Sequence, residues 1–256
     1  MIRLGGTIGY QVLRLMFPRK PAASTQTGRA DHLVSYHDRL QSLLSEEELE
    51  SLKSSSVADF GCGTGEGVIE LAESGFHSLV GIDIREKVLQ IGRKHAEDRG
   101  LSSRCRFVKN LENGSADAIL SIDAFEHFED PGTILECMSQ MLAHDGKVIA
   151  SFGPTWYHPR GGHLFSMFPW AHLVFSEKAL CRWRRDFKEN DAHRFNEVDG
   201  GLNGMTIAGF EKCVAESPFR IEKIKLRPIH PIRAFHNRFT REFLTSIFEC
   251  ILVKKK

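Results

Sequence analysis

Between residues 55 and 153, short apolar runs alternate with longer amphipathic segments. The apolar runs predict buried strands at 55–61, 77–84, 105–110, 116–123 and 147–153. The amphipathic segments predict helices, each closed by a glycine, at 65–75, 85–100 and 130–146. Because strands that alternate with helices are joined by right-handed crossovers, the pattern predicts an α/β domain built on a mostly parallel sheet.

One connection departs from this pattern. Only a short loop separates the strand predicted at 105–110 from the one at 116–123. A parallel crossover normally needs a dozen or more residues. This crossover is therefore expected to be unusually short or trimmed.

The regions on either side of the alternating core are less regular. Before it, residues 18–30 read as a linker, Asp31 is expected to cap a helix, and Ser45 with Glu48 predicts a capping box. After it, residues 154–202 are dense in aromatic residues, histidine, proline and arginine. We therefore expect an N-terminal helical segment over 1–53 and one domain over 54–256, with a cap inserted at 154–202.

Three further elements are expected beyond the cap. Residues 205–218 have the apolar spacing of a helix. Residues 219–229 and 246–254 are strand candidates. These elements are expected to complete the same domain.

A glycine-rich turn, VADFGCGTGEG at residues 57–67, follows the first strand and leads into a helix. Such turns form ligand sites because glycine lets the backbone approach a ligand at the carboxyl ends of the strands. A phosphate-binding P-loop is excluded, since no lysine follows the glycines. A dinucleotide fingerprint is excluded as well, because Glu66 or Val68 occupies the third glycine position in either register.

Two carboxylates accompany this turn. Asp59 precedes the glycines at the end of the first strand, and Asp83 ends the second strand. Asp59 suits an ammonium group, and Asp83 lies where a carboxylate reaches ribose hydroxyls. A carboxylate for an amine, an open backbone and a carboxylate for a ribose together describe S-adenosylmethionine. The alternative roles are a plain tight turn for the glycines and a helix N-cap for Asp83.

The segments VADFGCGTG, LVGIDI and ADAILSIDAFEHFEDP together resemble the class I S-adenosylmethionine-dependent methyltransferases over about residues 54–153. This resemblance implies a Rossmann-like, doubly wound, seven-stranded sheet that is mostly parallel. It also implies an antiparallel last strand inserted beside the sixth, which suits the candidates at 219–229 and 246–254. The cofactor would be S-adenosyl-L-methionine, and the chain would be a methyltransferase. The ending SIDAFEH of the fourth strand resembles the small-molecule branch of the family.

The resemblance also implies a role for individual residues. The methionine and sugar portion of the cofactor would lie against Asp59, Gly61, Gly63 and Gly65. Asp83 would bind both ribose hydroxyls, and Ile84 would pack on the adenine. Asn110 and Leu111 fall near the adenine, although the acidic residue common there is missing and a turn is the alternative role for Asn110. Ser121, Ile122 and Asp123 would lie beside the methyl group.

Contacts with the methyl acceptor are expected in the cap. His127, His158 and His163 are candidate general bases, with packing or solvent exposure as the alternative for each. The aromatic residues could form an apolar lid or could be plain core: Trp156, Tyr157, Phe165, Phe168 and Trp170. The acidic residues of the cap follow no recognisable order, so no metal site is expected.

The expected function is transfer of a methyl group to an oxygen or nitrogen of a small, partly apolar acceptor. One rival is a methyltransferase for a membrane-associated lipid or quinone precursor, suggested by the apolar stretch 164–175 and the basic ends. Another rival is a catalytically inactive, methyltransferase-like binding protein. The intact Asp59, glycine turn and Asp83 argue against the second.

Composition and charge change this picture only slightly. The net charge of +1 indicates no particular partner, although residues 1–30 hold five basic residues and no acid, and residues 219–256 hold ten basic residues against three acids. We expect solvated basic ends, with peripheral membrane contact as the alternative, and no nucleic acid partner. Six scattered cysteines without a C-x-x-C pair predict a reduced, cytoplasmic protein.

Overall fold

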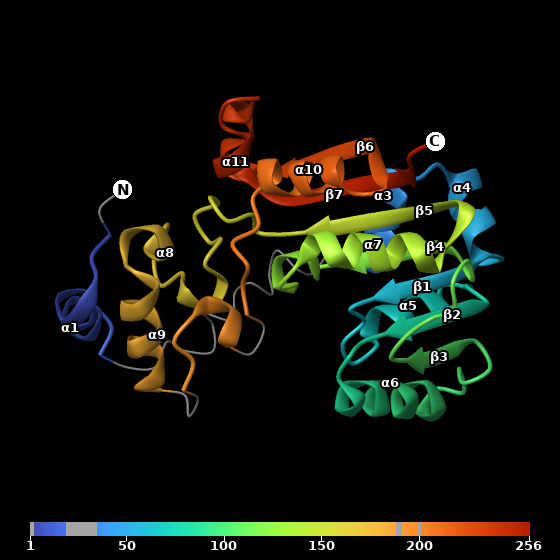
Figure 1. Cartoon of the computed structure of the whole chain (residues 1–256), viewed down its shortest axis with the longest axis horizontal. Coiled ribbons are helices and arrows are strands. Elements are labelled where there is room, and N and C mark those ends of the chain that lie inside the picture. The colour runs from blue at the N-terminus through green and yellow to red at the C-terminus, as the bar shows by residue number, and fades with distance from the viewer. Residues whose placement is uncertain (1–2, 19–34, 188–190, 199–200) are drawn as a thin grey trace.

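A seven-stranded sheet lies at the centre of the molecule, and Figure 1 shows a smaller helical group, α1, α8 and α9, beside it. The computed structural model describes residues 3–18, 35–187, 191–198 and 201–256. The strand order is β3-β2-β1-β4-β5-β7-β6. The strands are β1 Ser56–Phe60, β2 Ser78–Ile82, β3 Cys105–Val108, β4 Ala116–Ile122, β5 Leu142–Phe152, β6 Phe219–Pro228 and β7 Thr245–Lys254.

Strand directions place every functional loop at one edge. β1 to β5 pair in parallel, and β7 runs antiparallel to both β5 and β6. β6 is therefore parallel to β1–β5, and its carboxyl end lies at the same edge as theirs. The predicted doubly wound sheet with an antiparallel last strand is confirmed.

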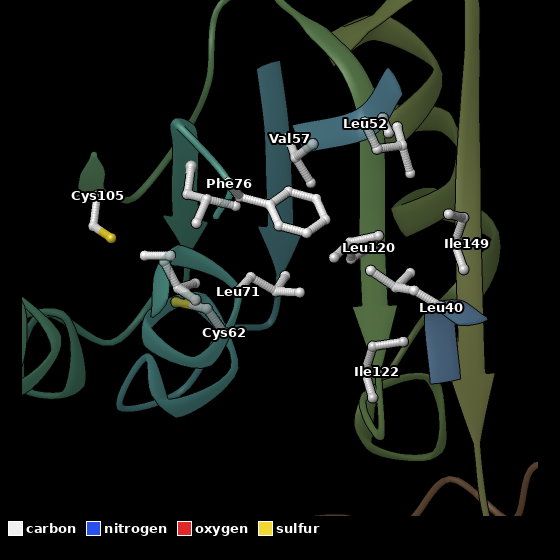
Figure 2. Packing of buried hydrophobic residues seen from close by; sticks show 14 of the residues in the cluster. Leu40, Leu52, Val57, Cys62, Leu71, Phe76, Cys105, Leu120, Ile122 and Ile149 are labelled. Carbon is white, nitrogen blue, oxygen red and sulfur yellow. The ribbon is translucent and has the colours of Figure 1, made fainter. Parts of the chain in front are cut away.

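Helices cover both faces of the sheet. One face packs against α3 (Tyr36–Leu43), α4 (Glu46–Lys53), α5 (Glu66–Glu73) and α6 (Glu86–Asp98). Figure 2 shows this layer, where Leu40 of α3 and Leu71 of α5 meet Leu120 and Ile149 of the sheet. The other face packs against α7 (Pro131–Met141) and α10 (Ile207–Glu216). Burial of both faces explains why the central strands β1, β2 and β4 read as continuous apolar runs.

The β3–β4 connection is shorter than an ordinary crossover, and α7 ends earlier than predicted. The β3–β4 connection spans only residues 109–115 and carries no helix, so the predicted short crossover is confirmed. The helix predicted to run to residue 146 ends at Met141, and that boundary was wrong. Leu142 turns to extended backbone (φ −75°, ψ 136°) and pairs with Ala116, so β5 starts earlier than the polar sequence around it indicates.

The cap and the N-terminal helix share a core of their own. The cap contains η3 (His163–Phe165), α8 (Ala171–Val174), α9 (Glu177–Arg185) and η4 (Phe195–Glu197), and α1 (Gly6–Met16) packs on α9. Tyr10 and Leu13 of α1 are buried among Phe175, Leu180 and Trp183.

Backbone bonds join the same two segments. The Leu4 N–H donates to Val174 O (2.8 Å), and the Ser176 N–H donates to Leu4 O (2.9 Å). The predicted capping box at Ser45 and Glu48 is present. The predicted cap residue Asp31 lies outside the described residues, and Ser35 caps α3 instead.

Candidate active site

The glycine turn between β1 and α5 forms the centre of the site. Gly61, Gly63 and Gly65 all have left-handed backbone, with φ of 84°, 54° and 78°. A Cβ on Gly63 would meet nothing within 4 Å, whereas a Cβ on Gly65 would collide with the Phe107 ring. Gly63 therefore leaves space for a ligand, while Gly65 is required by packing within the protein.

Asp59 lies beneath this turn and is buried. Its Oδ2 accepts a hydrogen bond from the Tyr36 hydroxyl (3.3 Å), and its Oδ1 has no hydrogen-bond partner among the described residues. Burial raises the pKa of Asp59 to about 7, although the Tyr36 hydrogen bond acts in the opposite direction. A buried carboxylate with an unused oxygen is a receptor for a cationic donor.

Asp83 ends β2 on the other side of the turn. Its Oδ2 accepts the Gly63 N–H (3.1 Å), and its Oδ1 accepts the Arg85 N–H (2.9 Å). The Arg85 guanidinium also pairs with both oxygens. Burial raises the pKa of Asp83, but the hydrogen bonds from Arg85 outweigh it and hold the pKa below its ordinary value. Asp83 is thus oriented by the turn and remains ionised.

The predicted adenine contacts lie at the neighbouring strand ends. The Asp83 N–H donates to Val108 O (3.3 Å), which brings the residues after β3 beside the end of β2. Asn110 is exposed and Leu111 is half-buried in this loop, and Ile84 is 85% exposed. The three residues share one edge with Asp59 and Asp83, and their contact with an adenine stays a prediction.

The end of β4 carries a second polar cluster. Asp123 has a left-handed backbone (φ 52°), and its Oδ2 accepts a hydrogen bond from the Arg39 guanidinium (2.8 Å). Arg39 is fully buried and also donates to the Ser151 hydroxyl. Ser121 is buried, and its Oγ has no partner among the described residues. This part of the edge is therefore polar and held in a strained conformation.

Glu126 belongs to the same cluster and was not predicted from the sequence. Its side chain is buried, and its Oε1 accepts the Gly153 N–H (3.2 Å). Burial, together with the charge of Asp123, raises the pKa of Glu126. A carboxyl group that can hold a proton near neutral pH is suited to proton transfer.

Helix α3 contributes two further residues that the sequence prediction missed. Tyr36 and Arg39 lie one turn apart and reach Asp59 and Asp123, respectively. The available signal was Arg39 itself, a charged residue among the apolar positions Leu40 and Leu43 of a predicted helix. A charged side chain on the buried face of a helix requires a partner of opposite charge.

The three candidate bases differ in their surroundings. His127 Nδ1 donates to Gly201 O (2.7 Å), which leaves Nε2 as the acceptor of the neutral ring, and its ring lies 5.9 Å from that of His163. His158 is buried, its Nδ1 accepts the Arg160 N–H (3.0 Å), and its Nε2 faces the Ser246 hydroxyl (3.5 Å). The role of each of the three as general base stays a prediction.

A cavity of about 780 Å³ is lined mainly by residues of the cap, with Arg3 and Glu129 also in its wall. Three aromatic residues line it, Trp156, Tyr157 and Phe195, together with charges of both signs: Arg3, Lys178, Arg194, Glu129 and Glu177. Asn203, which also lines this cavity, donates to Phe125 O (2.7 Å) and Phe128 O (2.8 Å). The cavity wall is thereby joined to the turn that follows β4.

The described parts of the chain show neither a metal-ion cluster nor a membrane-spanning helix. Residues 3–18, 35–187, 191–198 and 201–256 contain no group of three His, Cys, Asp or Glu side chains arranged to hold a metal ion. Within the same ranges, no helix is long and apolar enough to cross a membrane.

Comparisons with known proteins match the part of the chain that contains Asp59, Asp83 and Asp123. Residues 58–150 match a family described as "Methyltransferase domain". A ubiquinone biosynthesis O-methyltransferase from Pasteurella multocida is 29% identical over 119 residues, and one from Actinobacillus pleuropneumoniae is 32% identical over 115 residues. Each match covers 41% of this chain and 49% of the relative, so the chain spans about half the length of these proteins.

Solved structures show the same fold at low identity. A geranyl diphosphate C-methyltransferase from Streptomyces coelicolor has a TM-score of 0.53 at 12% identity, covering 83% of this chain and 79% of that one. An S-adenosylmethionine-dependent methyltransferase from Mesorhizobium loti has a TM-score of 0.53 at 18% identity, covering 83% and 94%.

Proposed function

We propose that the chain is a class I S-adenosylmethionine-dependent methyltransferase, an interpretation supported by the match of residues 58–150 to a methyltransferase domain family, and that it transfers a methyl group to an oxygen or nitrogen of a small, partly apolar acceptor. The observation that carries the proposal is the pair of carboxylates, Asp59 and Asp83, on either side of the open backbone at Gly63.

The residues present fit S-adenosyl-L-methionine. The unused Oδ1 of buried Asp59 suits its ammonium group, and the open position at Gly63 suits close approach of the ligand body. Asp83 is the proposed ribose acceptor, which requires the exposed Arg85 side chain to share or leave the carboxylate. The bound cofactor would supply an activated methyl group with a neutral leaving group.

The proposed acceptor site is the cavity of about 780 Å³ that is lined mainly by the cap and that meets the segment after β4 at Glu129. The protein's contribution there is to position the acceptor and to exclude water. Where the acceptor is a hydroxyl group, His127 is the proposed general base, because its Nδ1–H···O=C bond to Gly201 orients Nε2 as the proton acceptor.

A second candidate function is methylation of a lipid or quinone precursor. The similarity to ubiquinone biosynthesis O-methyltransferases favours it, since those relatives are named for the biosynthesis of a quinone. The proposed cytoplasmic location is compatible with a peripheral membrane enzyme of this kind. Identification of the methyl acceptor would distinguish these two candidate functions.

Cofactor binding tests the proposal first. Calorimetry with S-adenosyl-L-methionine should show one site, and Asp83→Ala should weaken binding by at least about tenfold, because the ribose hydroxyls lose a charged acceptor. Glu86→Ala is the matched control, since Glu86 lies three residues away in an exposed ion pair with Arg93. Unchanged affinity in Asp83→Ala would refute the ribose role. Absence of binding by a folded wild-type chain would favour an inactive binding protein.

Methyl transfer to an acceptor is the second part of the proposal to be tested. Incubation with methyl-labelled cofactor and pooled metabolites, phenols and prenylated phenols included, should label an acceptor. With that acceptor, His127→Asn should lower kcat by about 10²–10⁴-fold and remove the acidic limb of the pH profile. His158→Asn is the comparison, and an equal loss in both variants would argue against His127 as the base.

A further inference from the structure

The connection between β6 and β7, residues 229–244, exposes large aromatic side chains. Phe235 is 68% exposed and Phe239 is 76% exposed, with Ile232 and Phe243 partly exposed beside them. The connection contains η5 (His230–Phe235) and α11 (Arg241–Leu244), and in Figure 1 it projects beyond the sheet. Contiguous exposed apolar side chains of this size mark an interaction surface.

The connection and the strand before it are basic. Between Glu222 in β6 and Glu242 the chain has six Lys or Arg residues and no acid, and three of the six, Arg233, Arg238 and Arg241, lie in the connection itself. Four of the six make hydrogen bonds within the protein: Lys223 to Leu43 O, Lys225 to Ser42 O, Arg227 to Glu249 and Arg241 to Glu211. Arg233 and Arg238 have no ion-pair partner among the described residues, and Arg238 lies over the Phe239 ring (4.4 Å). The connection therefore carries two such cations together with the exposed rings, and one of the cations is stacked on Phe239.

The exposed rings are carried by an ordered turn. Asn237 Oδ1 accepts the N–H groups of Phe239 (2.9 Å) and Thr240 (3.3 Å), and the Thr240 hydroxyl donates to Phe235 O (2.6 Å). The turn thus satisfies part of its own backbone polarity, which lowers the cost of entering an apolar medium. Glu242 attaches the C-terminal side of the turn to the domain, because its carboxylate accepts hydrogen bonds from the Ile207 and Ala208 N–H groups at the start of α10.

The turn also adjoins the proposed acceptor cavity. The Phe243 ring packs against Tyr157 at 5.4 Å between centroids, and Tyr157 lines that cavity. The Thr155 hydroxyl donates to Glu242 O (3.3 Å). A surface contacted by Phe235 and Phe239 would therefore lie near the cavity entrance.

We propose that residues 229–244 dock the protein on an anionic phospholipid bilayer, with Phe235 and Phe239 inserted at the headgroup level and Arg233 and Arg238 on the lipid phosphates. The combination of exposed aromatic rings with unpaired cations matches the apolar boundary and negative charge of such a surface. A nucleic acid would engage the cations, but it would leave two adjacent rings without bases unless the strand were unpaired. The proposal does not depend on the methyl-transfer reaction.

Vesicle co-sedimentation tests the proposal without cofactor or acceptor. The protein should bind phosphatidylcholine vesicles containing about one third phosphatidylglycerol and should bind pure phosphatidylcholine much less. Phe235→Ser with Phe239→Ser should weaken binding by at least about tenfold, because both apolar contacts are lost. Arg233→Glu with Arg238→Glu should abolish the preference for anionic vesicles.

Matched controls remove the same chemistry elsewhere. Ile8→Ser with Leu15→Ser removes two similarly exposed apolar side chains (71% and 81%) from α1, and Lys87→Glu with Arg99→Glu makes the same charge change in α6 and at its C-cap. Both controls should retain binding. Equal loss in either control, or absence of wild-type binding to anionic vesicles, would overturn the proposal.

Two other occupants have separate signatures. A dimer that becomes a monomer in the Phe235→Ser, Phe239→Ser variant by light scattering would assign the surface to a second copy instead. Binding to a single-stranded oligonucleotide that is lost in the same variant, with no vesicle binding, would assign it to nucleic acid. Calorimetry with S-adenosyl-L-methionine on every variant shows whether the fold and the cofactor site are intact, so a failure of the proposed function remains distinguishable.

Discussion

Cofactor binding is expected to strengthen as the pH rises through about 7, because the carboxyl group of Asp59 must be ionised to receive the cofactor ammonium. Burial raises the pKa of this group from its ordinary 3.8 to about 7 in the cofactor-free protein. Below that pH a proton occupies the carboxyl group and has to leave before the ammonium binds. The observed affinity is therefore reduced by the protonated fraction.

The magnitude follows from this pKa. For one group that titrates at about 7, binding at pH 5 should be about 50-fold weaker than at pH 7, a difference of ~2.3 kcal/mol. The predicted change in affinity applies only up to pH 7, because the α-amino group of the cofactor loses its own proton near pH ~8. Titration calorimetry at several pH values in buffers of different ionisation enthalpy gives both the affinity and the protons released.

Two variants isolate Asp59 from other groups that titrate in this range, Glu126 among them. Asp59→Asn should bind weakly and show no slope between pH 5 and 7. Tyr36→Phe keeps the ring but removes the hydroxyl that lowers the Asp59 pKa, so the midpoint should move to higher pH. A wild-type affinity independent of pH, or a slope that survives in Asp59→Asn, would refute the reasoning.

Three further variants test stability by chemical denaturation. Because the pKa of Asp59 is raised in the folded state, ionisation of this carboxyl group destabilises the cofactor-free fold. The free energy of unfolding of Asp59→Asn should therefore exceed that of the wild type by up to ~4 kcal/mol at pH 8 and by little near pH 4. An equal gain at both pH values would contradict this cause. Gly65→Ala should cost more than Gly63→Ala, since both have left-handed backbone but only Gly65 faces Phe107, and equal costs would disprove the packing role. Arg39→Ala should cost ~2–4 kcal/mol, because it removes the buried cation that binds Asp123 and the buried Ser151 hydroxyl, whereas loss of an exposed cation should cost under ~1 kcal/mol.

The fold could be predicted because its determinants are local. The central strands β1, β2 and β4 are largely buried on both faces, so each appears in the sequence as an apolar run, and each is followed by a helix. The antiparallel pair β6 and β7 came from the family resemblance. The boundary at Met141 was missed because the polar residues His144 and Asp145 continue the helical pattern, while the pairing of Leu142 with Ala116 ends the helix. That pairing is a long-range contact, which local periodicity does not contain.

The candidate site was predictable only where the strands supply it. Asp59 and Asp83 follow apolar runs, so their placement at one edge follows from the parallel order. Tyr36 and Arg39 come from a helix that precedes the alternating pattern, and no local rule says that α3 lies against the ends of β1 and β4. The buried position of Glu126 likewise depends on Gly153, at the end of a different strand.

The charges at this edge also explain why a cationic ligand suits it. Asp59, Asp123 and Glu126 bring acidic groups together, and Arg39 is the buried cation that pairs with one of them. Burial raises the pKa of both Asp59 and Glu126, so the cofactor-free protein bears a cost for each ionised carboxylate. A dinucleotide would add a negative pyrophosphate and increase that cost. S-adenosylmethionine instead brings an ammonium and a sulfonium group, and its binding should lower the pKa of Asp59 and favour the ionised form that holds it.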